Sequence, residues 1–187
     1  MSVNLEDIGG SVCEPAAGVS KVFYALQSDF VTLNDTKKIC DENPANVAAN
    51  FAELAEISTD HVFKQGKCFH QIEAITNTGQ VTSTQKGEDE RHLFDNEFVF
   101  EIADSTAKVL GFQRFIKNKK FIFLIEEFGS GRVRQIGWSR LAALVSAQVH
   151  NLEAKTEGKN GATITIKDTN FGPAPIYNGA ILLTPQA

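Results

Sequence analysis

The stretch FIFLIEEFGSGRVRQIGW, from Phe121 to Trp138, decides the fold of this chain. From Phe121 to Ile125 apolar residues occupy both alternating sets of positions, which predicts a strand that is buried on both faces. Gly129-Ser130-Gly131 then offers the positive φ angles that a tight turn needs, and Arg132–Gly137 alternates apolar with polar residues. The stretch therefore predicts a β-hairpin in which the first strand is buried on both faces and the second strand is exposed to solvent on one face.

Strand patterns continue on both sides of this hairpin. Runs rich in β-branched and aromatic residues alternate with period two, and glycine or polar turns separate them. The predicted strands are Val19–Leu26, Ile57–Lys64, Lys67–Thr76, Leu93–Ile102, Ala142–Leu152 and Ala162–Lys167, with short additions at Phe30–Leu33 and Ile181–Leu183. We therefore expect a mainly β (α+β) chain, an antiparallel β-sandwich or barrel with one principal packing helix.

The principal helix is predicted over residues 104–117. Val109, Phe112 and Ile116 form one apolar stripe at helical spacing there, and we expect this stripe to pack on the sheet. A second, shorter helix is predicted over residues 43–54, because asparagine is a good N-cap and proline is tolerated at the first helical position.

Residues 76–91 are predicted to form a long flexible hairpin or loop. Val81 is the only bulky apolar residue in this segment, so the segment cannot bury enough surface to order itself. Loops of this length commonly serve binding in compact domains. We therefore take Thr78 and Glu88 as candidate self-association residues that become ordered against a neighbouring subunit.

Length, composition and charge exclude several classes of protein. The 187 residues suffice for one domain, which we place at 19–187 after an irregular N-terminal arm at 1–18. The net charge of −5 argues against a protein that grips nucleic acid through its phosphates. The N-terminal sequence lacks a leader pattern and no window approaches about 18 apolar residues, so we expect a soluble, cytoplasmically made protein without a membrane partner. The three scattered cysteines are expected to be reduced thiols.

The sequence contains no convincing catalytic or metal-binding constellation. The four histidines are scattered over predicted strands rather than gathered at ligand spacing. Glu126 and Glu127 are neighbours on a strand and point to opposite faces, which favours a solvated edge or a subunit contact over a catalytic pair. Asp168 and Asn170 suggest a calcium loop only faintly, since the later bidentate glutamate is missing, and a turn is the simpler interpretation. We expect no enzyme, no cofactor and no metal.

The order of elements resembles that of the tail tube (major tail) proteins of long-tailed bacteriophages. The local similarity is in the central hairpin and in the run LVSAQVHNLEAKTEGKNGATITIKDTNFGPAPIY, from Leu144 to Tyr177, with its asparagine-glycine turn and its final PAPIY. By layout the resemblance covers Val19 to Tyr177. It implies a β-sandwich or barrel flanked by one helix, and it carries no catalytic residue.

The resemblance implies a structural virion protein that assembles in the bacterial cytoplasm. Such subunits form hexameric rings that stack into a tube and contact other tail proteins, while DNA passes through a lumen lined by acidic groups. On this reading Arg132 and Arg134 are expected to meet acidic groups such as Glu126 on a neighbouring subunit. The alternative is a monomeric or dimeric β-barrel module that binds a small apolar ligand in a phenylalanine-rich interior.

Overall fold

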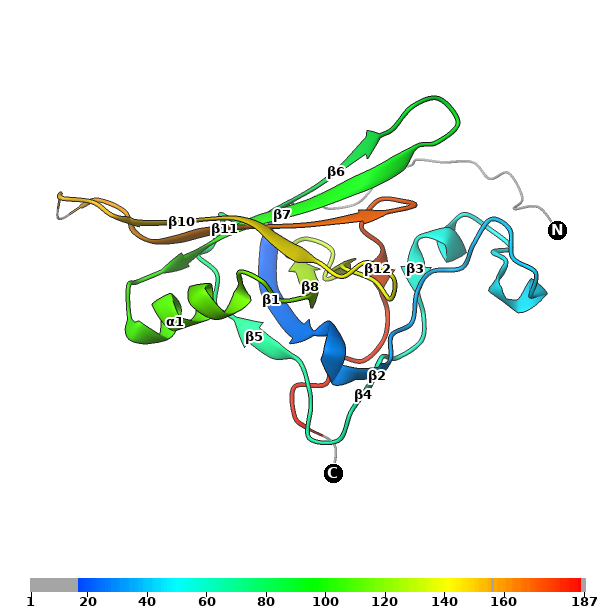
Figure 1. Cartoon of the computed structure of the whole chain (residues 1–187), viewed down its shortest axis with the longest axis horizontal. Helices are drawn as coiled ribbons and strands as arrows, with labels where there is room; N and C mark the ends of the chain where they lie inside the picture. The colour runs from blue at the N-terminus through cyan, green and yellow to red at the C-terminus, as the bar shows by residue number, and fades with distance from the viewer. Residues whose placement is uncertain (1–16, 156, 186–187) are drawn as a thin grey trace.

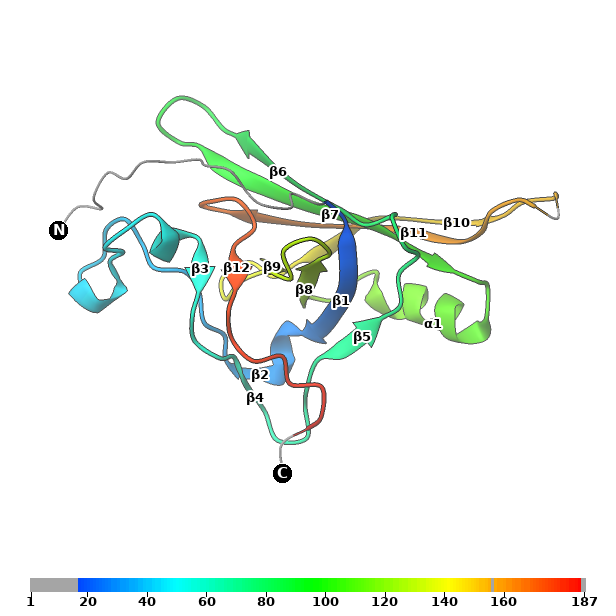
Figure 2. The ribbon, with the colours of Figure 1, turned by 180° about the vertical axis from the view of Figure 1, so that it is seen from behind.

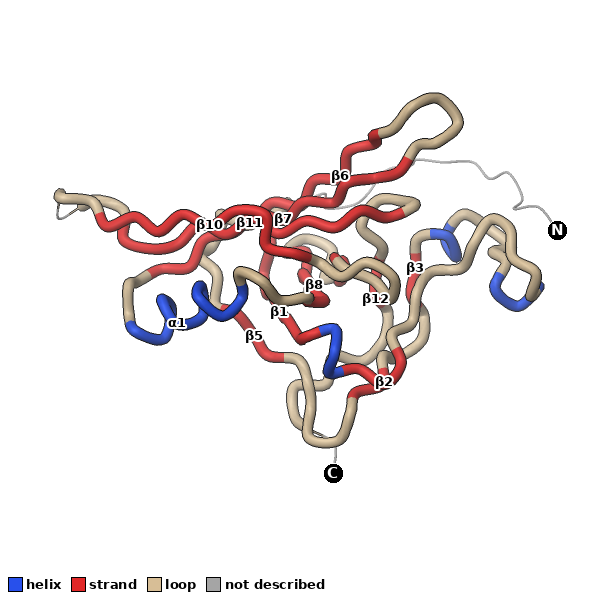
Figure 3. The backbone as a smooth tube through the Cα atoms, in the orientation of Figure 1, coloured by secondary structure: helices blue, strands red, loops and turns tan. Residues whose placement is uncertain are grey.

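The computed structural model describes residues 17–155 and 157–185, and over this part the chain is mainly β with one α-helix (Figure 1). The predicted N-terminal arm therefore lies almost wholly outside the described residues. Strands fall into a six-stranded, a four-stranded and a two-stranded sheet. Figure 3 shows strands and loops making up most of the backbone, with the α-helix (Ala107–Ile116) towards one end and short 3-10 turns elsewhere.

The six-stranded sheet is the centre of the molecule, and it contains both arms of the predicted hairpin. Its strand order is β3 (Glu56–Ile57), β12 (Ile176–Tyr177), β9 (Val133–Ile136), β8 (Phe121–Glu127), β1 (Val19–Leu26) and β5 (His70–Ile72). All neighbours are antiparallel except β3 and β12, which run parallel, so the sheet is mixed rather than antiparallel throughout. The central hairpin, β8 and β9, is confirmed.

The four-stranded sheet contains the longest strands. Its order is β10 (Leu144–Leu152), β11 (Asn160–Asn170), β7 (Leu93–Ala103) and β6 (Gln80–Lys86), and every neighbouring pair is antiparallel. A small two-stranded sheet joins β2 (Phe30–Thr32) to β4 (Val62–Phe63). In Figures 1 and 2 β1 runs across the direction of β7 and β11.

Two apolar clusters lie on opposite faces of the six-stranded sheet. One cluster joins Phe123 on β8 to Phe98 and Ile164 on the four-stranded sheet, and the other joins Leu124 to the segment around Phe69. Every residue of β8 from Phe121 to Ile125 is fully buried because alternate side chains enter alternate clusters. The prediction of a strand buried on both faces is confirmed.

Helix α1 (Ala107–Ile116) packs beside the first cluster, near β10 and β11 in Figure 1. Its N-cap is Thr106, whose hydroxyl accepts a hydrogen bond from the Val109 N–H, so the helix begins at Ala107, three residues after the predicted start. Ile116 is fully buried, and Val109 and Phe112 are partly buried against the cluster, which confirms the predicted stripe.

The helix predicted over residues 43–54 is wrong. The segment forms two separate 3-10 turns, Pro44–Asn46 and Ala52–Leu54. The Asn43 side chain does accept a hydrogen bond from the Ala45 N–H, so the predicted N-cap is confirmed. The helix fails because Lys38 pairs with this segment, accepting from the Ala48 N–H and donating to the Asn46 carbonyl. A non-local pairing therefore replaces helical hydrogen bonds.

Four other expectations are corrected in whole or in part. None of the sheets among the described residues closes into a barrel. The segment 76–91, predicted as a flexible hairpin or loop, contains the strand β6, which pairs with β7 along its whole length and forms a hairpin with it. The predicted short strand Ile181–Leu183 is irregular, although the Leu182 carbonyl accepts from the Phe69 N–H. The predicted strands Ile57–Lys64 and Lys67–Thr76 are reduced to the short strands given above.

Candidate functional site

The four-stranded sheet has two outer edges to which no strand among the described residues pairs. These edges are β6 on one side and β10 on the other. β10 is nine residues long and exposes Leu144 (44%), Val149 (53%) and Leu152 (73%). Unpaired edge strands expose a row of backbone donors and acceptors, and an apolar one is a template for pairing with another chain. These edges are the strongest candidate for a functional surface.

One face of this sheet is also free of the other strands and helices that the structure describes. Residues that pair directly across strands lie on the same face, so the register places Glu97, Lys167 and Thr82 on the face opposite buried Phe98 and Ile166. Threonines and charged residues make up most of this free face, and its acidic members are all on β7. The exposed apolar residues Leu144 and Val149 of β10 also lie on it, opposite Lys167 and Thr163. Its main residues on the other three strands are Asp95, Glu97, Val99, Glu101, Thr163, Thr165, Lys167, Thr169, Thr82 and Thr84.

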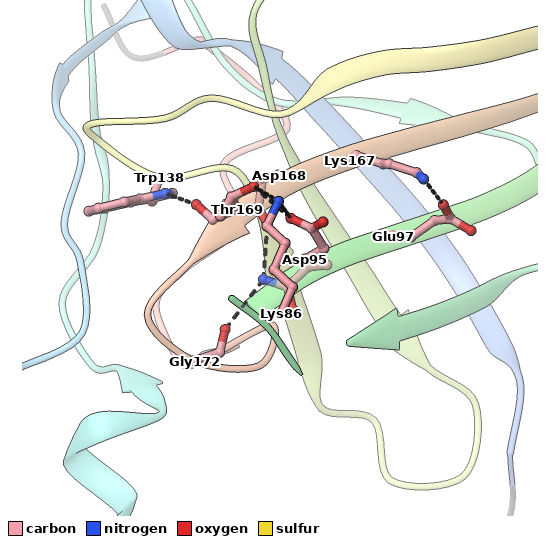
Figure 4. A network of polar contacts seen from close by, with 9 residues as sticks. Lys86, Asp95, Glu97, Trp138, Lys167, Asp168, Thr169 and Gly172 are labelled. Carbon is pink, nitrogen blue, oxygen red and sulfur yellow. Dashed lines mark hydrogen bonds and ion pairs between the residues drawn. The ribbon is translucent and has the colours of Figure 1, made fainter. Parts of the chain in front are cut away.

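A lysine pairs with each of the three acidic side chains of the free face. Figure 4 shows two of the ion pairs: Lys86 lies 2.6 Å from Asp95, and Lys167 lies 2.6 Å from Glu97. Glu101 pairs with Lys159. The ammonium of Lys86 and the hydroxyl of Thr169 hold the pKa of Asp95 below its usual value. These charges balance, so the face is polar without a strong net charge.

A buried polar cluster lies under the same end of the sheet, also seen in Figure 4. The Asp168 carboxylate, 5% exposed, accepts hydrogen bonds from the Gly137 N–H at 2.6 Å and from Asn96 Nδ2 at 2.9 Å. Asn96 in turn accepts from the Ser83 hydroxyl at 2.6 Å. Burial raises the pKa of Asp168 above its ordinary value, although the two hydrogen bonds partly offset this. The cluster joins β6, β7 and β11 to the end of β9.

Three of the four charged residues of the β8–β9 hairpin find partners within the same chain. Arg134 Nε lies 2.6 Å from Glu127, and its Nη1 donates to the Ala174 carbonyl. Glu126, on the opposite face, pairs with Lys21 at 3.2 Å, while Arg132 is exposed. Burial would raise the pKa of Glu127, but hydrogen bonds from Ser130 and Arg134 outweigh it and hold the pKa below its ordinary value. A role of Glu126, Arg132 and Arg134 in self-association stays a prediction.

Thr78 and Glu88 lie at the two ends of β6. The Thr78 hydroxyl donates to the Ile75 carbonyl at 2.6 Å and accepts from the Glu101 N–H at 3.2 Å, so it ties the chain before β6 to β7. Glu88 is exposed in the turn between β6 and β7, where its carbonyl accepts from the Arg91 N–H. The structure thus gives Thr78 a local role and leaves Glu88 accessible; their role between subunits stays a prediction.

A second buried polar cluster, centred on His61, was not found from the sequence. The Asn34 N–H donates to His61 Nδ1 at 3.2 Å, so the neutral ring carries its proton on Nε2, which lies 2.8 Å from Gln135 Oε1. The ring stacks on Tyr177 with 4.4 Å between centroids, and the Tyr177 hydroxyl accepts from the His61 N–H. Burial lowers the pKa of His61. Only the alternation that places Gln135 inward on β9 signalled this cluster in advance.

The other predicted sites remain separate in space. In the described ranges no three His, Cys, Asp or Glu side chains gather as a metal-binding group. Asp168 faces Gly137, and Asn170 accepts from the Phe171 N–H, so both are engaged in local hydrogen bonds. Cys40 is exposed and Cys68 is buried, both as free thiols, while the third cysteine lies outside the described residues. None of the helices seen in the structure has the length and hydropathy needed to cross a bilayer.

No protein-family model, curated protein sequence or solved structure matches the chain. The arguments about function therefore depend on the geometry of this molecule.

Proposed function

We propose that this chain is a structural subunit of a phage tail tube, in which six copies form a ring by pairing β6 of one subunit with β10 of the next. Rings stack into a tube through which DNA passes without being gripped. The subunit contacts other tail proteins, and the tube is part of a virion assembled in a bacterial cytoplasm. The observation that carries the proposal is the pair of free edges on the four-stranded sheet.

The directions of the strands support such a ring. β10, β11, β7 and β6 alternate in direction, so β6 and β10 run opposite to each other. Rotation about a ring axis keeps the direction of every strand, and each junction between subunits is therefore antiparallel. Antiparallel pairing satisfies the free backbone groups of both edges, and closure removes edges altogether. A ring of six such sheets has roughly two dozen strands, well beyond the size at which barrels leave an aqueous channel.

The free face of the sheet supports the second half of the proposal. In a closed ring this face is the one available to line the channel, because the other face is covered by the apolar core. Its ion pairs balance its charge, so phosphates meet neither a strongly attractive nor a strongly repulsive wall. The acidic lumen implied by the resemblance is replaced in this proposal by a neutral, threonine-rich one that does not hold DNA.

The alternative of a ligand-binding barrel receives less support. Phenylalanine and isoleucine fill the space between the two large sheets, and an open depression of about 550 Å³ is at the surface between β2 and the residues that follow α1. An interior of this kind is packed rather than hollow. A protein that stays monomeric and binds a small apolar ligand would therefore overturn the proposal.

Blocking the β10 edge tests the proposal. Lysines on edge strands oppose pairing with another sheet, so Leu144→Lys together with Val149→Lys should convert hexamers to monomers. Both side chains are about half exposed, and the circular dichroism spectrum and melting temperature should therefore hardly change. Sedimentation velocity and negative-stain microscopy measure the assembly at matched protein concentration.

The matched control is Ile39→Lys together with Leu183→Lys, which also replaces two exposed apolar residues but leaves both edges intact. The control should assemble like the parent protein. A parent that sediments as a monomer at all concentrations, or a β10 variant that still forms rings, refutes the proposal.

A further inference from the structure

The exposed side of α1 and of the four residues after it is strongly basic and partly apolar. Five cations lie between residues 108 and 120 and no acidic residue does; they are Lys108, Arg114, Lys117, Lys119 and Lys120. All five are exposed, and none forms an ion pair with a described residue. Leu110 (46%) and Phe115 (48%) are exposed beside them. We call this surface the basic helix face.

The basic helix face is unusual because the chain as a whole has a net charge of −5. Gly111, Arg114, Phe115 and Lys117 line an open depression of about 510 Å³ on it. Lys119 Nζ lies 5.7 Å from the centre of the Phe115 ring, within the range of a cation–π contact. Uncompensated cations around exposed apolar groups call for an acidic partner that can displace water from the depression.

The acidic counterpart on this chain is the tip of the β6–β7 hairpin. Glu88, Asp89 and Glu90 are three consecutive exposed acids there, followed by Arg91, so the tip keeps an acidic excess. None of the three pairs with a cation of the described chain. Gly87 has a φ of +119°, and a Cβ there would meet the Arg91 carbonyl at 2.5 Å, so the tip has a defined turn.

The two surfaces lie at opposite ends of the molecule. Figures 1 and 2 show the β6–β7 tip at one end of the long axis and α1 towards the other, beneath the turn between β10 and β11. They cannot meet within one chain. The strands of the four-stranded sheet run along the same axis, so copies placed end to end bring the tip of one copy to the basic helix face of the next.

We propose that the basic helix face is the docking site for the acidic β6–β7 tip of a second copy of this chain. The contact joins different surfaces of the two copies, so it repeats in one direction and builds a stack rather than a closed dimer. Within the proposed tube it is the contact between successive rings, and that part of the inference rests on the proposed function. The docking contact itself requires only two copies.

Charge swapping tests the contact. The first variant, Glu88→Lys with Glu90→Lys, makes the tip basic. The second, Lys117→Glu with Lys119→Glu, makes the depression on the helix face acidic, because Arg114 is then the only cation among its lining residues. Each variant alone opposes like charges across the contact, so its end-to-end association should weaken by more than about tenfold. In an equimolar mixture every junction is complementary again, and the stacks should return. Sedimentation velocity and electron microscopy at 0.1 M and 1 M salt provide the readout.

The control is Lys64→Glu with Lys67→Glu, two exposed lysines in the β4–β5 turn, of which Lys67 lies 3.2 Å from Asp29. It also replaces two lysines by glutamates and should associate like the parent. Parent stacks should shorten at 1 M salt, where the screening length falls to about 3 Å. Persistence of stacks in either variant alone, or no recovery on mixing, overturns the proposal. So does a helix variant that stacks normally but loses binding to anionic phosphatidylglycerol vesicles or to duplex DNA.

The two proposals fail separately in these experiments. Hexamers that persist in each single variant but no longer stack support both the docking contact and the ring. A parent that never forms hexamers but makes salt-sensitive chains that the charge swap breaks and restores refutes the ring and retains the docking contact.

Discussion

Replacing Asp168 with alanine should destabilise the fold because two buried hydrogen-bond donors lose their acceptor. The Gly137 N–H is buried and bonds only the Asp168 carboxylate, and Asn96 Nδ2 retains only a long contact of 3.4 Å to the Gly172 carbonyl. An unsatisfied buried donor costs about 1–3 kcal/mol. Part of this is offset because the buried carboxylate is itself unfavourable, as its raised pKa indicates. We therefore expect a loss of about 2–4 kcal/mol in the free energy of unfolding.

Asp95→Ala is the matched control for this measurement. Asp95 lies near Asp168 in Figure 4 but pairs with Lys86 and Thr169 at the surface, where an ion pair contributes less than about 1 kcal/mol. Urea unfolding at pH 7, followed by circular dichroism and intrinsic fluorescence, gives the unfolding midpoints of the two variants. If their m-values equal that of the parent, differences in midpoint report differences in stability. Midpoints that fall equally in the two variants would refute the reasoning about buried donors.

The pH dependence of the Asp168→Ala effect has a definite sign. Because the folded-state pKa of Asp168 lies above its unfolded value of about 3.9, the folded protein binds more protons between these two values. The extra stability that comes from this pKa difference is therefore fully present below pH of about 3.9 and is lost as the pH rises through the folded pKa, while the hydrogen bonds from Gly137 and Asn96 still stabilise the fold at pH 7. The stability difference between parent and variant should widen as the pH is lowered from 7 towards 4.

Two further predictions concern a glycine and the buried histidine. Gly137→Ala should cost at least about 3 kcal/mol, because φ is +92° and the new Cβ would lie 2.6 Å from the Phe121 carbonyl oxygen and 2.7 Å from the Ala143 nitrogen. Gly111→Ala, with open space around it, should be neutral or stabilising by about 0.5–1 kcal/mol in the same urea unfolding measurement. The pKa of His61 is lower in the folded protein, so the unfolded chain binds more protons below pH of about 6.5, and the free energy of unfolding should fall as the pH is lowered until the folded pKa is passed. A His61→Phe variant lacks this group, so its urea midpoint should decline less than that of the parent between pH 7.5 and 5. Equal declines in the two proteins would contradict this reasoning.

Local sequence determined the elements whose hydrogen bonds and buried faces can be read within one segment. The run of apolar residues from Phe121 to Ile125 identified β8, the stripe through Ile116 identified α1, and the alternation in Val19–Leu26 identified β1 with the bounds found in the structure. In each case the periodicity indicates which side chains become buried. The hydrophobic effect drives this burial with little dependence on which other element packs against the segment.

Tertiary pairing decided the elements whose stability comes from another part of the chain. The polar segment Gln80–Lys86 buries too little to order itself, yet it is a full strand because β7 accepts its backbone hydrogen bonds. The segment after Asn43 prefers a helix locally but loses it to pairing with Lys38. The clusters around His61 and Asp168 depend on residues that are far apart in sequence. Backbone and buried polar groups must find partners wherever the fold supplies them, and a one-dimensional pattern does not contain those distances.

The candidate surfaces divide in the same way. The composition of residues 108–120 and of Glu88–Glu90 makes one segment basic and the other acidic in the sequence alone. Their places at opposite ends of the molecule, and the two free edges of the four-stranded sheet, follow only from the order in which the strands pair. Charge is a property of residues, whereas an unpaired edge is a property of the sheet, because a strand becomes an edge only when its neighbours have been chosen.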